Sequence, residues 1–311
     1  MVLNCGNIDR HLLQNFGFTK RKGENMLEKL NYQWAVVLIA IVSVALVSSA
    51  NAQTLVHRYD FNTTNDSVGT ANGTLVGTAS LAGGALVTDG GKGTVNGTWS
   101  GTGPRMTLDP SAVAGITGAF SIEDWFTCTT GWPKYDSCYA LSDGSDPGSQ
   151  SASYLLAVPV RGYNPYPSGV NVVGAGGISR PAVGWDLGME GIYLDTPGVH
   201  QTVLTYDGNS FRYYVDGVLS TFGIGGGPVS DPGFNLSTLP NIGINGGSPF
   251  NDPSLTGSTY DFRIYSGALS ADQVATNFAA GSDVVGIPEP GTIALLVVGI
   301  FGLLWVRFRK N

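Results

Sequence analysis

The chain has 311 residues and a net charge of −7, with 16 Lys and Arg against 23 Asp and Glu. The acidic balance is stronger in the middle, because residues 53–287 hold eight basic and 19 acidic residues, a net charge of −11. Such a surface repels phosphate backbones, which argues against nucleic acid as a partner. The 45 glycines and the scarcity of helical periodicity predict one domain of short strands joined by tight turns.

The N-terminal region has the pattern of a secretion signal. An apolar stretch over residues 35–47 precedes Ala50-Asn51-Ala52, a small-x-small pattern that signal peptidase cleaves. We predict a dispensable or misassigned extension over residues 1–25, a signal peptide over 26–52, and export through the inner membrane. A retained membrane anchor is the alternative, which is disfavoured because the apolar stretch is short for a bilayer span.

Four segments define the architecture expected of the domain over residues 53–283. Apolar and polar residues alternate in the clearest of them, which is typical of half-buried strands. In the first segment this alternation places Leu55, His57 and Tyr59 on one face. The third segment predicts a hairpin with a turn at 207–209. The predicted strands are 55–61, 120–126, the hairpin strands 201–206 and 211–215, and 260–265.

Cys128 and Cys138 are the cysteines that remain once the signal peptide is removed. Export would place them in an oxidising compartment, and the Gly and Pro residues between them indicate a loop that joins neighbouring strands. We therefore predict a disulfide between the two. Metal binding by this pair is not expected, because no His or further Cys lies nearby to complete a tetrahedral set.

A short helix is predicted to close the domain. Ser270 as N-cap and Gln273 three residues later form a capping box. Leu269 and Val274 are placed to form a hydrophobic staple across the same helix start. The helix is expected to end near Phe278.

The C-terminal tail over residues 287–311 combines three features in a fixed order. Pro288, Glu289 and Pro290 come first, an apolar run follows, and four residues rich in Arg and Lys come last. This order resembles the PEP-CTERM sorting signal of Gram-negative bacteria. The resemblance implies recognition of the Pro-Glu-Pro motif by an exosortase, a transmembrane helix over 292–306 that is released, and display at the cell surface or in the extracellular matrix. A plain, retained C-terminal anchor is the alternative.

The middle domain as a whole resembles the LamG-like, concanavalin A-like jelly rolls. The order and spacing of seven pieces carry this resemblance, which covers nearly the whole domain. It implies an all-β fold of two antiparallel sheets, one of them curved, with one short C-terminal helix. The seven pieces are residues 57–61, 65–69, 72–75, 120–125, 204–208, 214–217 and 263–270.

The family resemblance also bears on catalysis. Enzymes of this fold that cleave glucans carry a Glu-x-Asp-x-(x)-Glu strand, since retaining hydrolysis needs two carboxylates about 5 Å apart. The domain has only Glu123 and Glu190, which are 67 residues apart and belong to no such motif. Glu123 stands where non-enzymatic members commonly hold Glu, which favours a structural role. His57 and His200 lie within or at the edge of predicted strands and support no triad, so we expect no enzymatic activity and no catalytic residue.

Sugar binding would need exposed aromatic rings beside polar groups. Several aromatic residues lie in predicted loops, and packing beneath a long loop explains them equally well. Asp124 shares a strand face with Phe120 and Ile122, so either a charge lies near the core or that face opens to a binding site. We favour a hydrogen-bonded or partly exposed Asp124 over a ligand-binding one. The candidate ligand-binding residues are Trp132, Tyr135, Tyr163, Tyr166, Trp185 and Asp124.

Calcium is the one cofactor that the resemblance suggests. Related domains often hold a structural Ca²⁺ ion near an early Asp-Ser turn, which corresponds here to Asp66 with carbonyl oxygens from its loop. An ordinary Asx turn is the alternative at this position. Asp60 and Asp261 are weaker candidates for metal ligands.

These patterns together predict an exported, surface-sorted, non-catalytic protein that binds extracellular polysaccharide or another surface component. Signal peptidase, exosortase and, transiently, the inner membrane would be its partners during export. Two alternatives from other classes stay open. One is a structural protein of the extracellular matrix or biofilm with no discrete ligand, and the other is a degenerate glycoside hydrolase.

Overall fold

The computed structural model describes residues 53–91, 103–128, 136–145, 153–159, 169–173, 187–190, 198–220, 222–223, 229–250 and 252–285. These residues belong to a compact unit, Asn51–Asn311. The predicted signal peptide and the predicted sorting tail lie outside the described residues. Within those residues, every helix is too short or too polar to span a bilayer.

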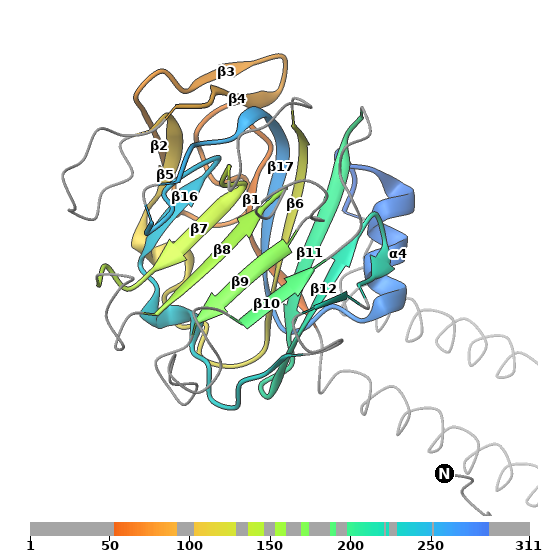
Figure 1. Cartoon of the computed structure of the whole chain (residues 1–311). Coiled ribbons are helices and arrows are strands. Elements are labelled where there is room, and N and C mark those ends of the chain that lie inside the picture. The colour runs from red at the N-terminus through yellow and green to blue at the C-terminus, as the bar shows by residue number, and fades with distance from the viewer. Residues whose placement is uncertain are drawn as a thin grey trace, which may run out of the picture. The chain divides into compact units, whose positions relative to one another are not determined.

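Two antiparallel sheets form the domain, as predicted (Figure 1). In the part of the chain that the structure describes, sheet A runs in the order β13-β12-β11-β6-β17-β4-β3, with β1 beside β17 and β15 beside β12. Sheet B runs in the order β14-β10-β9-β8-β7-β16-β5-β2. The strands of sheet A are β1 (Thr54–Tyr59), β3 (Ser80–Ala82), β4 (Ala85–Asp89), β6 (Phe120–Cys128), β11 (His200–Tyr206), β12 (Ser210–Val215), β13 (Val218–Leu219), β15 (Val229–Ser230) and β17 (Thr256–Ser266). The strands of sheet B are β2 (Gly73–Val76), β5 (Arg105–Leu108), β7 (Tyr139–Ser142), β8 (Tyr154–Val158), β9 (Gly169–Val173), β10 (Leu187–Glu190), β14 (Phe222–Gly223) and β16 (Asn241–Ile244).

The predicted hairpin is confirmed as the pair β11 and β12, which are antiparallel neighbours. Its turn is held by Asp207, whose Oδ1 accepts hydrogen bonds from the backbone N–H groups of Asn209 and Ser210. The predicted strands at 120–126 and 260–265 are also confirmed, and they pair with each other as β6 and β17 at the centre of sheet A. β17 begins four residues earlier than predicted because its first residues pair with β4.

The strict alternation predicted for the first strand is wrong at one point. The pairing of β1 with β17 shifts register between Leu55 and His57, which marks a β-bulge or similar irregularity. Leu55 therefore packs against a different cluster from Tyr59, which is fully buried in the main core. The strand also ends before Phe61, whose φ of 54° turns the chain away from the sheet.

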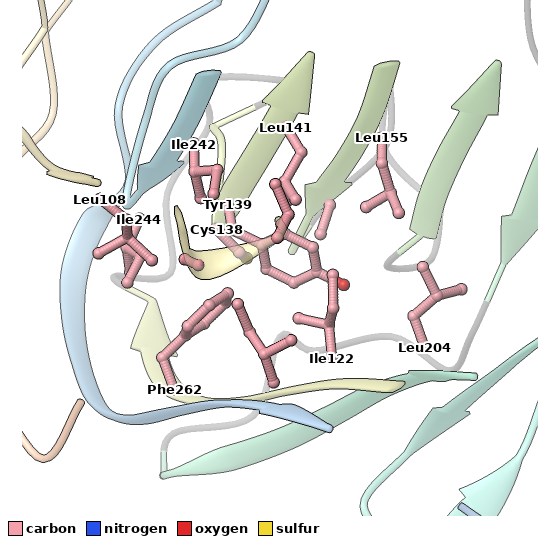
Figure 2. Close-up of a cluster of buried hydrophobic side chains, with 14 of the residues drawn as sticks. Leu108, Ile122, Cys138, Tyr139, Leu141, Leu155, Leu204, Ile242, Ile244 and Phe262 are labelled. Carbon is pink, nitrogen blue, oxygen red and sulfur yellow. The ribbon is translucent and has the colours of Figure 1, made fainter. Parts of the chain in front are cut away.

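The main core lies between the two sheets, where side chains from both inner faces meet (Figure 2). Ile122 and Phe262 of sheet A face Tyr139, Leu141 and Leu155 of sheet B. The rings of Tyr139 and Phe262 meet edge to face, with centroids 5.4 Å apart. Each of these side chains is at most 1% exposed, so burial of apolar surface between the sheets is the main source of stability.

The predicted helix is confirmed as α4 (Ala271–Ala280), which packs on the outer face of sheet A beside β11 and β12 (Figure 1). Both hydrogen bonds of the capping box between Ser270 and Gln273 are present. Leu269 and Val274 lie in one buried cluster, as expected of a hydrophobic staple. The helix ends two residues beyond the predicted Phe278. Two short 3-10 helices, η1 (Pro110–Ala112) and η2 (Leu236–Thr238), complete the described elements.

Candidate functional site

The two sheets differ in what covers their outer faces. The outer face of sheet A lies beneath α4. On sheet B, Met106 and Leu108 of β5 point into the core, so the alternate residues Arg105 and Thr107 lie on the opposite side. We refer to that side as the outer face of sheet B. At β5 it offers partly exposed polar groups, whereas over β7 and β8 it carries a buried apolar cluster of Ala140, Tyr154, Leu156 and Val158.

A polar row crosses the outer face of sheet B over β2, β5 and β16. Thr107 stands opposite Thr74 on one side and opposite Gly243 on the other. The Thr107 hydroxyl donates to the Thr74 carbonyl at 3.3 Å, and the Asn241 side-chain amide donates to the Ser142 carbonyl at 3.2 Å. Thr74 and Asn241 are exposed, so their remaining donors and acceptors can exchange hydrogen bonds with the hydroxyl groups of a sugar.

The segment that follows β16 crosses the same face and brings an aromatic ring to it. A Cβ atom on Gly243 would lie 2.4 Å from the Gly246 carbonyl oxygen, so glycine at this position lets the crossing backbone lie directly against the sheet. Phe250 then meets Tyr154 of β8 edge to face, with ring centroids 5.2 Å apart. Phe250 is 38% exposed, which leaves an aromatic surface available near the polar row.

A pair of carboxylates lies at the same end of the sandwich. Asp136 Oδ2 accepts hydrogen bonds from the backbone N–H and the hydroxyl of Thr256, both at 3.3 Å. Burial raises the pKa of Asp136 to about 6, and the charge of Asp252 adds to the shift. Asp252 in turn accepts the hydroxyl of Ser248 at 2.6 Å. Asp136 therefore titrates closer to neutral pH than an ordinary aspartate does.

Glu123, by contrast, has a structural role, because all of its surroundings are protein. Its Oε1 accepts hydrogen bonds from Trp125, Gln201 and Arg263, and its Oε2 accepts them from Tyr265 and Asn277. The side chain is 0% exposed beneath α4. A carboxylate with five donors and no access to solvent cannot take a proton from a substrate, which agrees with the structural role predicted for it.

Asp124 differs from both interpretations that the sequence allowed. It is neither hydrogen-bonded nor partly exposed, because it is 0% exposed and neither carboxylate oxygen has a hydrogen-bond partner in the described structure. Strand alternation places it between Thr202 of β11 and Phe262 of β17, on the core side of sheet A. Burial raises the pKa of Asp124 well above its usual range, and the charges of Asp261 and Glu123 raise it further. Asp124 is therefore a core residue, out of reach of a ligand in solution, and its burial favours the neutral acid.

The carboxylates proposed as calcium ligands have other partners. Asp66 accepts hydrogen bonds from the His57 ring and from four backbone N–H groups, one of which, that of Val68, forms the Asx turn named above as the alternative. Asp261 pairs with Arg58 at 2.6 Å and with Arg263 at 2.9 Å. Asp60 accepts the backbone N–H of Asn62 at 3.1 Å. Among the described residues, no group of three His, Cys, Asp or Glu side chains is arranged to hold a metal ion.

The structure contains no bond between Cys128 and Cys138, so the predicted disulfide stays a prediction. The expectation of neighbouring strands is wrong, because Cys128 ends β6 in sheet A whereas Cys138 directly precedes β7 in sheet B. Burial raises the pKa of the Cys138 thiol well above its usual range, which suppresses its reactivity.

The remaining ligand-binding candidates, Trp132, Tyr135, Tyr163, Tyr166 and Trp185, lie outside the described residues. The residues of the polar row were missed at the level of the sequence. One signal for them exists, because Arg105, Met106, Thr107 and Leu108 alternate polar and apolar. Four residues are too few to distinguish a strand from a turn, and the partners of this strand follow from the fold alone.

The polar row thus lies on the outer face of sheet B beside the buried apolar cluster of β7 and β8. The family model of the concanavalin A-like lectin/glucanases superfamily matches residues 100–275. The chain therefore belongs to the concanavalin A-like lectin/glucanase superfamily. No protein of curated function matches the chain.

Several solved structures share the fold. Domain 4 of AbnA, an extracellular GH43 arabinanase from Geobacillus stearothermophilus, solved in complex with arabinotriose, has a TM-score of 0.50 and 20% identity over 72% of this chain and 98% of that domain. The binding domain of botulinum neurotoxin DC, in complex with SialylT, has a TM-score of 0.48 and 13% identity over 74% of this chain and 51% of that one. Trypanosoma rangeli sialidase has a TM-score of 0.48 and 16% identity, and the match covers 75% of this chain and 34% of the sialidase.

Proposed function

We propose that the chain is an exported, non-catalytic protein that binds extracellular polysaccharide through the outer face of sheet B. The observation that carries this proposal is the polar row of that face. Thr74 and Asn241 are exposed there, and Phe250 offers an aromatic ring nearby. Hydroxyl and amide groups beside an aromatic surface are the groups that exchange hydrogen bonds and stacking contacts with sugar rings.

Two further observations support a binding role. The arabinanase domain with the same fold was solved in complex with arabinotriose. The match covers 98% of that domain. In addition, Glu123 accepts five hydrogen bonds and is shielded from solvent, so it is not available as an acid or a base. Binding without cleavage needs neither a free carboxylate pair nor a metal.

Affinity electrophoresis of the Asn51–Asn311 unit through gels that contain one polysaccharide each would test the proposal. We expect slower migration in at least one polysaccharide gel than in a plain gel. Asn241→Ala removes one exposed amide from the polar row and should weaken retention about fivefold, the effect of losing about 1 kcal/mol of hydrogen bonding.

The matched control is Thr276→Ala, which removes one polar group from the exposed side of α4 on the other sheet. Retention of this variant should equal that of the unmodified protein. If no polysaccharide slows the protein, the structural matrix role replaces the binding role. If Thr276→Ala weakens retention as much as Asn241→Ala does, the binding face is wrongly assigned.

A second candidate function, glycoside hydrolysis, is favoured by one observation. Asp136 has a pKa of about 6 and lies near Asp252, an arrangement that suits a general acid with a carboxylate partner. Against it, Asp136 is only 7% exposed. Incubation of each retained polysaccharide with the protein and with Asp136→Asn, followed by an assay of new reducing ends, distinguishes the two. Hydrolysis that Asp136→Asn abolishes would establish an enzyme, and we expect none.

We further propose that residues 26–52 direct export and that an exosortase recognises Pro288, Glu289 and Pro290. The apolar stretches and the small-x-small and Pro-Glu-Pro patterns support this route. N-terminal sequencing of the protein recovered from the surface of its host should yield Gln53 as the first residue. Recovery of the chain from the cytoplasm with residues 26–52 attached would contradict the proposal.

A further inference from the structure

The described residues contain four arginines, and three of them meet carboxylates. Arg58 pairs with Asp261 at 2.6 Å, Arg212 pairs with Asp207 at 2.6 Å, and Arg263 lies between Asp261 and Glu123. The fourth, Arg105, has no carboxylate partner in the described structure. Its one hydrogen bond runs from Nη1 to the Gly103 carbonyl at 3.0 Å. In a domain with more than twice as many acidic as basic residues, an arginine without an acidic partner is a marked exception.

Arg105 lies on the outer face of sheet B, two residues from Thr107 along the same strand. The crossing backbone packs against its stem, because a Cβ atom added to Gly246 would lie 3.2 Å from Arg105 Cβ and one added to Gly247 would lie 3.7 Å from Arg105 Cδ. Packing against backbone on this side limits the conformations of the stem. The guanidinium is thereby held near the polar row before any ligand arrives.

The electrostatic setting of Arg105 favours an anion. Its side chain is half-buried, and burial lowers the pKa of Arg105, because removal of water destabilises the charged guanidinium. Of its five N–H donors, the described structure uses one. An anion at this position would compensate for the lost solvation and accept hydrogen bonds from N–H donors that point in parallel from the planar guanidinium.

We infer that the outer face of sheet B binds polysaccharides that carry carboxylate groups, such as polymers of uronic acids, and that Arg105 binds the carboxylate. This inference rests on the proposed function and narrows its ligand class. The planar guanidinium fork matches a planar carboxylate in two parallel hydrogen bonds. The hydroxyl groups of Thr74 and Thr107, in the neighbouring row, would meet the uncharged hydroxyls of the same sugar. Because the domain is acidic as a whole, specificity comes from this local geometry rather than from long-range attraction.

Polygalacturonate and its methyl ester provide a matched pair of ligands, because esterification removes the charge and keeps the sugar backbone. Affinity electrophoresis of the Asn51–Asn311 unit should show retention by polygalacturonate and at least tenfold weaker retention by the ester, since a charge-assisted bidentate contact is lost. Arg105→Gln should weaken retention by polygalacturonate about tenfold or more. Arg105→Lys, which keeps the charge but not the fork, should be intermediate.

Arg212→Gln is the control, since it removes an arginine of β12 in sheet A that is already paired with Asp207. It should bind polygalacturonate as the unmodified protein does, and a melting curve of each variant should show that the fold persists. Equal retention of acid and ester, or unchanged binding by a folded Arg105→Gln, overturns the inference. Retention by neutral polysaccharides alone would support the proposed function and contradict the preference for carboxylates. Retention by no polysaccharide would contradict both the proposed function and this inference.

Discussion

Glu123 and Asp124 are adjacent acidic residues on β6, and their side chains lie on opposite faces of sheet A in different surroundings. Both side chains are 0% exposed. Glu123 lies on the α4 side of sheet A, where five side-chain donors surround its carboxylate. Asp124 lies on the core side, where no donor in the described structure reaches either of its oxygens. The comparison shows that burial alone does not decide how an acidic residue behaves.

The hydrogen-bond donors and cations around the carboxylate also determine how a buried acidic residue behaves. Arg263, buried beside Glu123, supplies a compensating charge as well as hydrogen bonds, and it also binds Asp261. No cation of the described residues pairs with Asp124, so burial favours the neutral acid. The α4 side of β6 is therefore a paired, charged network that should be sensitive to loss of any member. The core side is an apolar layer that carries one neutral carboxyl group.

The largest expected effect is that of Glu123→Gln. The substitution keeps the shape of the side chain but leaves the buried Arg263 with one carboxylate fewer, and removal of one partner from a buried pair costs about 3–5 kcal/mol. Urea unfolding of the Asn51–Asn311 unit at pH 7 would measure this loss in the free energy of unfolding. A loss below about 1 kcal/mol would mean that the network does not stabilise the fold.

Asp124→Asn should change the free energy of unfolding at pH 7, compared with its effect at pH 3, in the opposite direction to Glu123→Gln. Because the folded-state pKa of Asp124 is raised, the folded protein retains a proton that the unfolded chain releases, and stability falls as the pH rises above the unfolded value of 3.8 towards the folded one. An amide of the same shape does not titrate. Relative to the difference between the two proteins at pH 3, Asp124→Asn should therefore gain stability over the unmodified protein at pH 7.

The pH dependence distinguishes this cause from better packing. The advantage of Asp124→Asn should be absent below pH 3.8 and should grow as the pH increases, which unfolding curves at pH 3, 5 and 7 would reveal. An advantage that is the same at all three pH values would show that ionisation of Asp124 plays no part.

The smallest expected effect is that of Arg212→Gln. Arg212 and Asp207 form an ion pair at 2.6 Å, and their side chains are 37% and 35% exposed. Solvent screens such a pair, so its loss should cost less than about 1 kcal/mol. A thermal melt would show a shift far smaller than that of Glu123→Gln. Equal shifts for the two variants would contradict the distinction between buried and exposed pairs.

Much of the fold follows from local patterns. Alternation in β6 and β17 indicates strands, the capping box of Ser270 and Gln273 indicates the start of α4, and the turn residues 207–209 indicate the hairpin. Alternation also predicts that Glu123 and Asp124 lie on opposite faces. Each of these patterns depends on residues that are neighbours in the chain, which is why the sequence is sufficient to predict them.

The partners of Glu123 and the polar row depend instead on contacts between distant segments. Gln201, Tyr265 and Asn277 lie 78, 142 and 154 residues from Glu123 in the sequence. Their approach depends on the register of β11 and β17 and on the position of α4. The same holds for Thr74 and Thr107, which become neighbours only when β2 pairs with β5. The expectation that Cys128 and Cys138 flank a loop between neighbouring strands is wrong for the same reason, since the assignment of β6 and β7 to different sheets is not a local property.

Hydrogen–deuterium exchange of the Asn51–Asn311 unit, with and without a polysaccharide that retains it, tests most directly the central claim that the outer face of sheet B binds sugar. We predict slower exchange on binding in β2, in β5 and in residues 245–250, and unchanged exchange in α4. Protection confined to α4, or no protection in any segment of sheet B, would contradict the claim.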